Sequence, residues 1–158
     1  MKSTNFAISG LPLEAFSHLF ELDDTGLAAR NARRCIADVK PGFPCRVSLA
    51  EAEIGESVLL LTYEHHPVDG PYRGTGPVYV REHAKQAQLK VNEVPDVVRR
   101  RLISVRAYNA QSLMVASEVV EGSNLEQQID RFFADQQISY LHLHNAKPGC
   151  FSCRVDRV

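Results

Sequence analysis

The chain ends in two alternating segments, YLHLH at residues 140–144 and FSCRVD at residues 151–156. Successive side chains of a β-strand point to opposite faces of a sheet, so the leucines of the first segment lie on one face and its histidines on the other. An antiparallel hairpin that buries both apolar sets together puts His142 and His144 on the same face as Arg154. A shift of one residue would mix the two faces. The pattern therefore predicts the hairpin and its register.

The polar face of this hairpin is expected to carry Tyr140, His142, His144, Ser152, Arg154 and Asp156, and the apolar face of its second strand Phe151, Cys153 and Val155. Two interpretations of the polar face stay open. Antiparallel sheets commonly have one solvated face that needs no function. Paired histidines are nevertheless an uncommon choice for a plain wet surface, and they favour a site.

A second feature is a phrase that occurs twice, KPGFPCRV at residues 40–47 and KPGCFSCRV at residues 147–155. Each copy ends in an alternating Phe-x-Cys-Arg-Val. The alternation predicts that Cys45 and Cys153 are small core residues rather than reactive thiols, and that Arg46 points the other way. The sequence does not say whether the two copies touch in space.

Cysteine and histidine near the C-terminus also raise the question of zinc. Cys150 and Cys153 form a Cys-x-x-Cys downstream of His142 and His144. Zinc requires ligands that converge tetrahedrally, whereas two residues three apart on an extended strand point to opposite faces. We therefore expect no metal and no cofactor, and keep this four-residue set as an alternative.

Length and composition are those of one soluble globular domain spanning residues 1–158, with 44% hydrophobic and 23% charged residues. A net charge of -1 argues against nucleic acid as a partner, because phosphate neutralisation needs a basic face. No apolar run reaches the length of a membrane span, and the N-terminus lacks a signal-peptide pattern. A cytoplasmic protein with four reduced cysteines is expected.

The spacing of hydrophobic residues, together with turn and capping residues, predicts the secondary structure. Strands are expected at 6–9, 34–39, 58–63, 77–82, 102–108, 112–120, 139–144 and 151–157, and helices at 12–20, at 24–32 with an Asp23 or Asp24 cap, at 95–101, and after the capping-box sequence SNLE at 123–126. Hairpins outnumber β-α-β patterns. The fold class predicted is α+β, a mainly antiparallel sheet with helices packed on one face.

The segment 65–73 places many polar side chains at a strand end and in the loop that follows. Adjacent His65 and His66 would point oppositely on a regular strand, but a proline after them favours a break. Asp69 could orient an imidazole, Tyr72 could donate a hydrogen bond, and Arg73 could grip a carboxylate or phosphate. The alternative is a turn rich in Pro, Gly and Asp with incidental polar residues.

Several of these phrases resemble domain-of-unknown-function family 1203, a group of small bacterial proteins. The matching segments are GFPCRVSL at 42–49, residues 63–71, GPVYVRE at 76–82, HNAKPGC at 144–150 with the preceding HL, and CRV at 153–155. The resemblance implies a single-domain protein from a bacterial source. It brings no activity, cofactor or catalytic residue with it.

Together these features lead to a hypothesis of one polar pocket that binds a small anionic ligand, with the segment 65–73 as its lid. The candidates for catalysis are His65, His66, Asp69, His142 and His144, and those for ligand binding are Arg46, Tyr72, Arg73, Tyr140 and Arg154. Proton transfer or hydrolysis fits these side chains best, because a histidine titrates near neutral pH.

Two alternatives come from other classes of protein. One is a non-catalytic interaction module that contacts a protein partner or a second copy of the chain as a homodimer. The other is a metal-dependent enzyme that uses His142, His144, Cys150 and Cys153.

Overall fold

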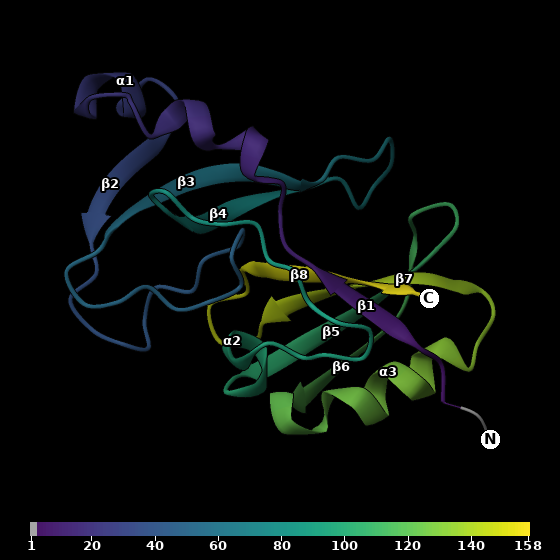
Figure 1. Ribbon diagram of the computed structural model, residues 1–158. Coiled ribbons are helices and arrows are strands. Elements are labelled where there is room, and N and C mark those ends of the chain that lie inside the picture. Colours follow the sequence, from purple (N-terminus) through teal and green to yellow (C-terminus); the bar gives the residue numbers. More distant parts are fainter. Residues whose placement is uncertain (1–2) are drawn as a thin grey trace.

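The computed structural model describes residues 3–158, which form two antiparallel sheets (Figure 1). A five-stranded sheet has the order β1-β8-β7-β5-β6, and a three-stranded sheet the order β2-β3-β4. The strands are β1 (Phe6–Ser9), β2 (Ala32–Ile36), β3 (Ser57–His66), β4 (Gly74–Arg81), β5 (Leu102–Asn109), β6 (Met114–Glu121), β7 (Ile138–Asn145) and β8 (Phe151–Arg157). The helices are α1 (Asp24–Ala28), α2 (Asp96–Arg99) and α3 (Leu125–Phe133). The predicted α+β class, with mainly antiparallel pairing, is confirmed.

Helices account for most differences from the predicted elements. Residues 12–20 form two 3₁₀ turns, Leu13–Ala15 and Ser17–Leu19, because Phe16 at φ -124° lies outside the helical region. Asp23 is the cap of α1, and its carboxylate accepts from the Gly26 amide at 2.8 Å. The predicted capping box before α3 does not form, since residues 122–124 make a 3₁₀ turn that runs directly into the helix.

The β7–β8 hairpin has the predicted register. Tyr140 pairs with Asp156, Leu141 with Val155, His142 with Arg154 and Leu143 with Cys153. Beyond Leu143 the register shifts, so that His144 pairs with Phe151 and Ser152 is an extra residue on β8. The bulge turns Phe151 onto the histidine face. The prediction that its ring joins Cys153 and Val155 on the apolar face is therefore wrong.

Two hydrophobic cores lie on opposite sides of this hairpin. The leucines of β7 and the Cys153–Val155 side of β8 pack with α3, which runs along one face of the five-stranded sheet (Figure 1). A second core joins β3 and β4 to the N-terminal turns and includes Phe151. Cys45 and Cys153 are both fully buried, as predicted. Because β3 ends against the other face of the hairpin, the histidines there do not face solvent.

The two copies of the repeated phrase meet in space and tie the sheets together. From the first copy, the Arg46 guanidinium donates to the Phe151 carbonyl at 2.7 Å and to the Cys150 sulfur at 3.0 Å. The backbone amide of Arg46 donates to the Tyr79 carbonyl of β4 at 2.9 Å. One residue thus holds the start of β8 beside the middle of β4.

Across the described part of the chain, no helix is long and apolar enough to cross a membrane.

Candidate functional site

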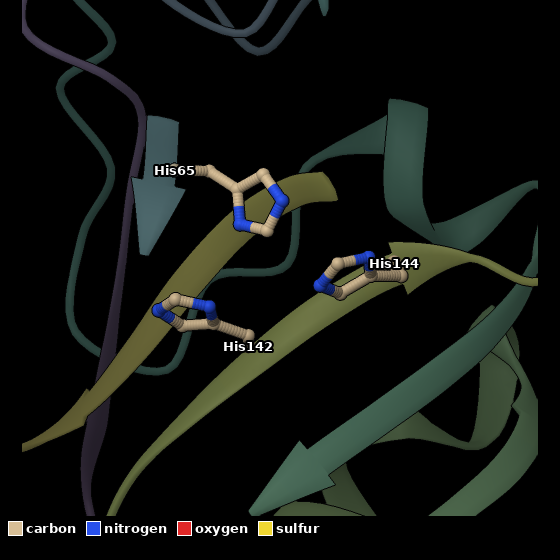
Figure 2. A group of neighbouring side chains, drawn as sticks. All are labelled: His65, His142 and His144. Atoms are coloured by element: carbon tan, nitrogen blue, oxygen red, sulfur yellow. The ribbon is translucent and has the colours of Figure 1, made fainter. Parts of the chain in front are cut away.

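Three histidines from two different sheets converge at the centre of the molecule. His65 comes from the end of β3, and His142 and His144 come from the same face of β7. One ring nitrogen from each residue lies within 4.8 Å of those of the other two. Figure 2 shows the three rings turning a nitrogen toward a common space. Within residues 3–158 this is the one group of His, Cys, Asp or Glu side chains with such a geometry.

The nitrogens at the centre of the cluster lack partners. His142 and His144 are each only 2% exposed, and the buried atoms His65 Nδ1, His142 Nδ1 and His144 Nε2 have no hydrogen-bond partner among the described residues. Buried polar atoms in folded proteins are nearly always paired. Three unpaired nitrogens on neighbouring rings therefore point to a group that binds between them.

The orientation of His144 is set by the repeated phrase. Its Nδ1 lies 2.9 Å from the Gly149 carbonyl, which can only accept, so Nδ1 carries the proton and Nε2 keeps its lone pair. Gly149 has φ +82°, a conformation that favours glycine. A carbonyl on the outer nitrogen is the usual second partner of a metal-bound imidazole.

The ring of His65 contacts an aromatic side chain and a glycine. It stacks on Phe151 with 5.1 Å between the centroids and 2° between the planes. A Cβ added at Gly74 would lie 2.8 Å from His65 Cε1, so a larger residue there would displace the ring. The β8 bulge that turns Phe151 onto this face thus also positions His65.

Burial keeps the three imidazoles neutral. Desolvation, followed by the charges of the neighbouring histidines and Arg154, lowers the pKa of His142 to about 2. Desolvation also lowers the pKa of His65 and of His144 to about 4, although the hydrogen bond to Gly149 opposes this for His144. At neutral pH all three rings are therefore uncharged, the form that binds metal ions.

His66 packs against His142 but has both of its nitrogens occupied. Its Nδ1 donates to the Tyr72 carbonyl at 2.7 Å, so Nε2 accepts from the Tyr140 hydroxyl at 2.6 Å. Tyr140 Oη also lies 3.0 Å from Ser112 Oγ. A register shift between Tyr63 and His66 breaks the regular strand, and both histidines line one pocket.

Two pockets adjoin the cluster. One of about 390 Å³ is lined by His65 and His144 together with Arg73 and Arg106. The other, of about 490 Å³, is lined by His65 and His142, and its wall also includes Tyr140, Arg154, Ser112 and the segment 65–68. Because His65 belongs to both, the cluster can be reached from either side.

Four of the five ligand-binding candidates line these two pockets: Tyr72 and Arg73 the smaller one, and Tyr140 and Arg154 the larger one. Arg154 stacks over the Tyr140 ring at 4.1 Å and pairs with Asp156 at 2.9 Å. The Arg73 guanidinium lies 3.0 Å from the Glu64 carboxylate and 3.7 Å from that of the fully exposed Asp69. The Tyr72 ring packs edge-on against Tyr108. Arg46 lines a different pocket.

The structure does not assemble the predicted set of two histidines and two cysteines. Cys153 lies opposite Leu143 on the face toward α3, whereas Cys150 precedes β8 and contacts Arg46. The two sulfurs therefore have different surroundings and do not converge with His142 and His144.

Sequence reasoning missed Arg106, which pairs with His142 across β5 and β7 and so shares its face. Among the described residues no carboxylate lies within 4.0 Å of its guanidinium; its Nε donates to Ser104 at 3.3 Å. The signal was present in the strand itself, since Ser104, Arg106 and Tyr108 alternate with Ile103, Val105 and Ala107.

A family described as "Protein of unknown function (DUF1203)" matches residues 42–157. The chain belongs to the DUF1203 family. The matched region includes all three clustered histidines, the second copy of the repeated phrase and residues 42–47 of the first. Neither curated proteins nor solved structures gave a match. The DUF1203 description names no activity, so the chemistry of the site has to be argued from its geometry.

The depressed histidine pKa values predict how the metal-free protein responds to acid. Below the ordinary histidine pKa of about 6.5 the unfolded chain takes up protons, whereas the folded protein takes them up only near pH 4 or lower. The free energy of unfolding should therefore fall as pH drops from 6.5 to 4. Each fully buried histidine should contribute a slope of about 1.4 kcal/mol per pH unit.

Urea unfolding of chelator-treated protein at a series of pH values measures this slope. His142→Gln should lower the slope by about one proton relative to the native chain, whereas the exposed His18→Gln should leave it unchanged. An equal slope in His142→Gln and the native protein would show that His142 is not held neutral.

Proposed function

We propose that this protein binds a divalent transition-metal ion through His65, His142 and His144 and hydrolyses a small anionic substrate at that ion. The observation that carries the proposal is the convergence of three buried, unpaired imidazole nitrogens on one space. The proposal replaces the cysteines of the sequence-based metal alternative with His65. It keeps the anionic ligand of the main sequence hypothesis.

The donor set indicates which metals fit. Imidazole suits zinc, copper, nickel and iron, whereas magnesium and calcium need oxygen ligands, and none is in the cluster. Tetrahedral zinc with Zn–N distances of about 2.0–2.1 Å needs nitrogens about 3.4 Å apart. The present separations of up to 4.8 Å would have to shorten as the rings close around the ion.

Three protein ligands leave a fourth position for water or substrate, which is the arrangement of catalytic rather than structural zinc sites. A bound zinc ion lowers the pKa of its water to about 7 and so supplies a hydroxide nucleophile at neutral pH. The adjoining pockets give a substrate access to that position. Hydrolysis is the reaction class that these features support best.

An anionic substrate is supported by the charges that face the cluster. Arg106 shares a face with His142, lines the same pocket as His144 and, in the described part of the chain, has no acidic partner. Arg73 lines that pocket too, although Glu64 offsets its charge. A guanidinium without a carboxylate beside a metal site is suited to hold a carboxylate or phosphate of the substrate.

Protons could pass through the other side of the cluster. His66 packs against His142 with 4.8 Å between ring centroids and is joined to Tyr140 and Ser112 by hydrogen bonds. His66 Nε2 accepts a hydrogen bond from the Tyr140 hydroxyl, and the pair lies in the pocket that reaches His142. In the proposed reaction the Tyr140 hydroxyl donates its proton to the leaving-group oxygen and regains one from water.

Metal binding is the first test. The untagged native protein should bind one zinc ion per chain in elemental analysis and calorimetry. His142→Gln and His144→Gln should each weaken binding by about 100-fold or more, since even outer partners of metal ligands are worth 10–100-fold. The exposed His18→Gln and His83→Gln are matched controls and should bind as the native chain does. A folded native protein that binds no transition metal would refute the site.

Hydrolysis is tested separately with p-nitrophenyl phosphate as an anionic probe and p-nitrophenyl acetate as a neutral one. With zinc supplied to both, the native protein should cleave the phosphate ester faster than His142→Gln does. Arg106→Gln should raise KM for the phosphate ester by about tenfold, the effect of one lost charge-assisted hydrogen bond. Arg33→Gln, an exposed arginine on β2, is the control.

If zinc binds but neither ester is cleaved, the hydrolytic function is wrong and the metal site stands. That outcome would favour a non-catalytic role for the DUF1203 protein.

A further inference from the structure

A third pocket of about 560 Å³ shares Pro148 and Cys150 of the turn at residues 147–150 with the smaller pocket beside the histidine cluster. Its lining includes Arg46, Arg100, Arg101, Glu121, Asn145 and Lys147. None of the three clustered histidines lines it. Both copies of the repeated phrase contribute to its wall, and the proposed metal chemistry makes no use of it.

Arg46 is the most unusual residue of this pocket. It is only 3% exposed, and no carboxylate of residues 3–158 lies within 4.0 Å of its guanidinium. Three of its five N–H groups donate to the Phe151 and Pro44 carbonyls and to the Cys150 sulfur. A buried guanidinium normally has an anionic partner, since an unpaired buried charge is costly. The two remaining N–H groups of Arg46 are free to bind an anion.

Asn145 supplies a hydrogen-bond acceptor beside the donors of Arg46. It is 6% exposed, and its Oδ1 is buried with no hydrogen-bond partner in the described chain. Its Nδ2 and the Arg46 guanidinium approach the same atom, Cys150 Sγ, at 3.7 and 3.0 Å, so the two side chains are neighbours. The floor of the pocket therefore offers unused donors and an unused acceptor within one small area.

The rim adds positive charge. Arg100 and Lys147 are exposed lining residues, although Asp96 lies 3.8 Å from the Arg100 guanidinium, and Arg101 is paired with Glu51. Glu121 is the one acidic side chain in the lining. The balance of charge around the pocket is positive, and it favours an anion.

We propose that this pocket binds a phosphate group, free or as part of a small organic molecule, through Arg46 and Asn145. Arg46 donates to the phosphate oxygens, and Arg100 and Lys147 attract the charge at the rim. Asn145 Oδ1 accepts from a protonated phosphate oxygen. A phosphate group has a second pKa of about 6, so much of it keeps an O–H group near that pH. Sulfate has no such proton and cannot donate to Asn145.

The comparison of phosphate with sulfate is therefore the test, carried out by calorimetry at pH 6 on chelator-treated protein. Inorganic phosphate should bind saturably, and sulfate at least about tenfold more weakly, because sulfate would leave the buried Asn145 oxygen unpaired. Asn145→Asp, which is nearly isosteric, should weaken phosphate binding by about tenfold or more, since it adds a negative charge.

A double variant at the rim, Arg100→Glu with Lys147→Glu, keeps the test valid if Asn145→Asp does not fold. It should also weaken binding about tenfold, whereas Arg33→Glu on the exposed face of β2 should not. Glycerol phosphate in place of inorganic phosphate identifies the source: tighter binding of the ester shows that an organic phosphate is the ligand, and tighter binding of the free ion shows the reverse.

His142→Gln separates this site from the histidine cluster. Phosphate binding should persist in that variant and in the absence of metal. Loss of binding in His142→Gln would place the anion at the cluster and overturn the proposal. So would equal affinities for phosphate and sulfate, or no saturable binding of phosphate to the native chain.

Discussion

Burial of Leu141 and Leu143 against α3 is the constraint on which the rest of the site depends. Side chains alternate along a strand, so this burial places His142 and His144 on the opposite face of β7 and fixes which residues of β5 and β8 accompany them. The three-stranded sheet then covers that face. The histidine face of β7, which could have been exposed to solvent, is therefore buried, and its histidines are neutral.

The repeated phrase explains how the two sheets come to enclose this interior. Its first copy runs between β4 and β8, where Arg46 binds carbonyls and a sulfur instead of an acid. Its second copy supplies the Gly149 carbonyl that orients His144 and the bulge that brings Phe151 under His65. The same short motif therefore joins the sheets, positions two of the three histidines and lines the pocket proposed to bind phosphate.

The sequence predicted the parts that depend on local alternation. The β7–β8 register, the buried Cys45 and Cys153, the central strand β3 and the shared face of His142 and Arg154 all followed from it. It could not predict the bulge at Ser152, because one extra residue in a strand leaves no mark in its composition. The third histidine was named as a candidate but not as a partner of His142 and His144. That contact depends on how the two sheets pack, which no local pattern encodes.

A crystal of the protein soaked in zinc, with anomalous data collected on both sides of the zinc absorption edge, tests the central claim most directly. The account predicts one strong peak within about 2.0–2.1 Å of a nitrogen of His65, His142 and His144, with the fourth position open to a pocket. A peak elsewhere, or a space between the rings that stays without zinc while the protein remains folded, would contradict it.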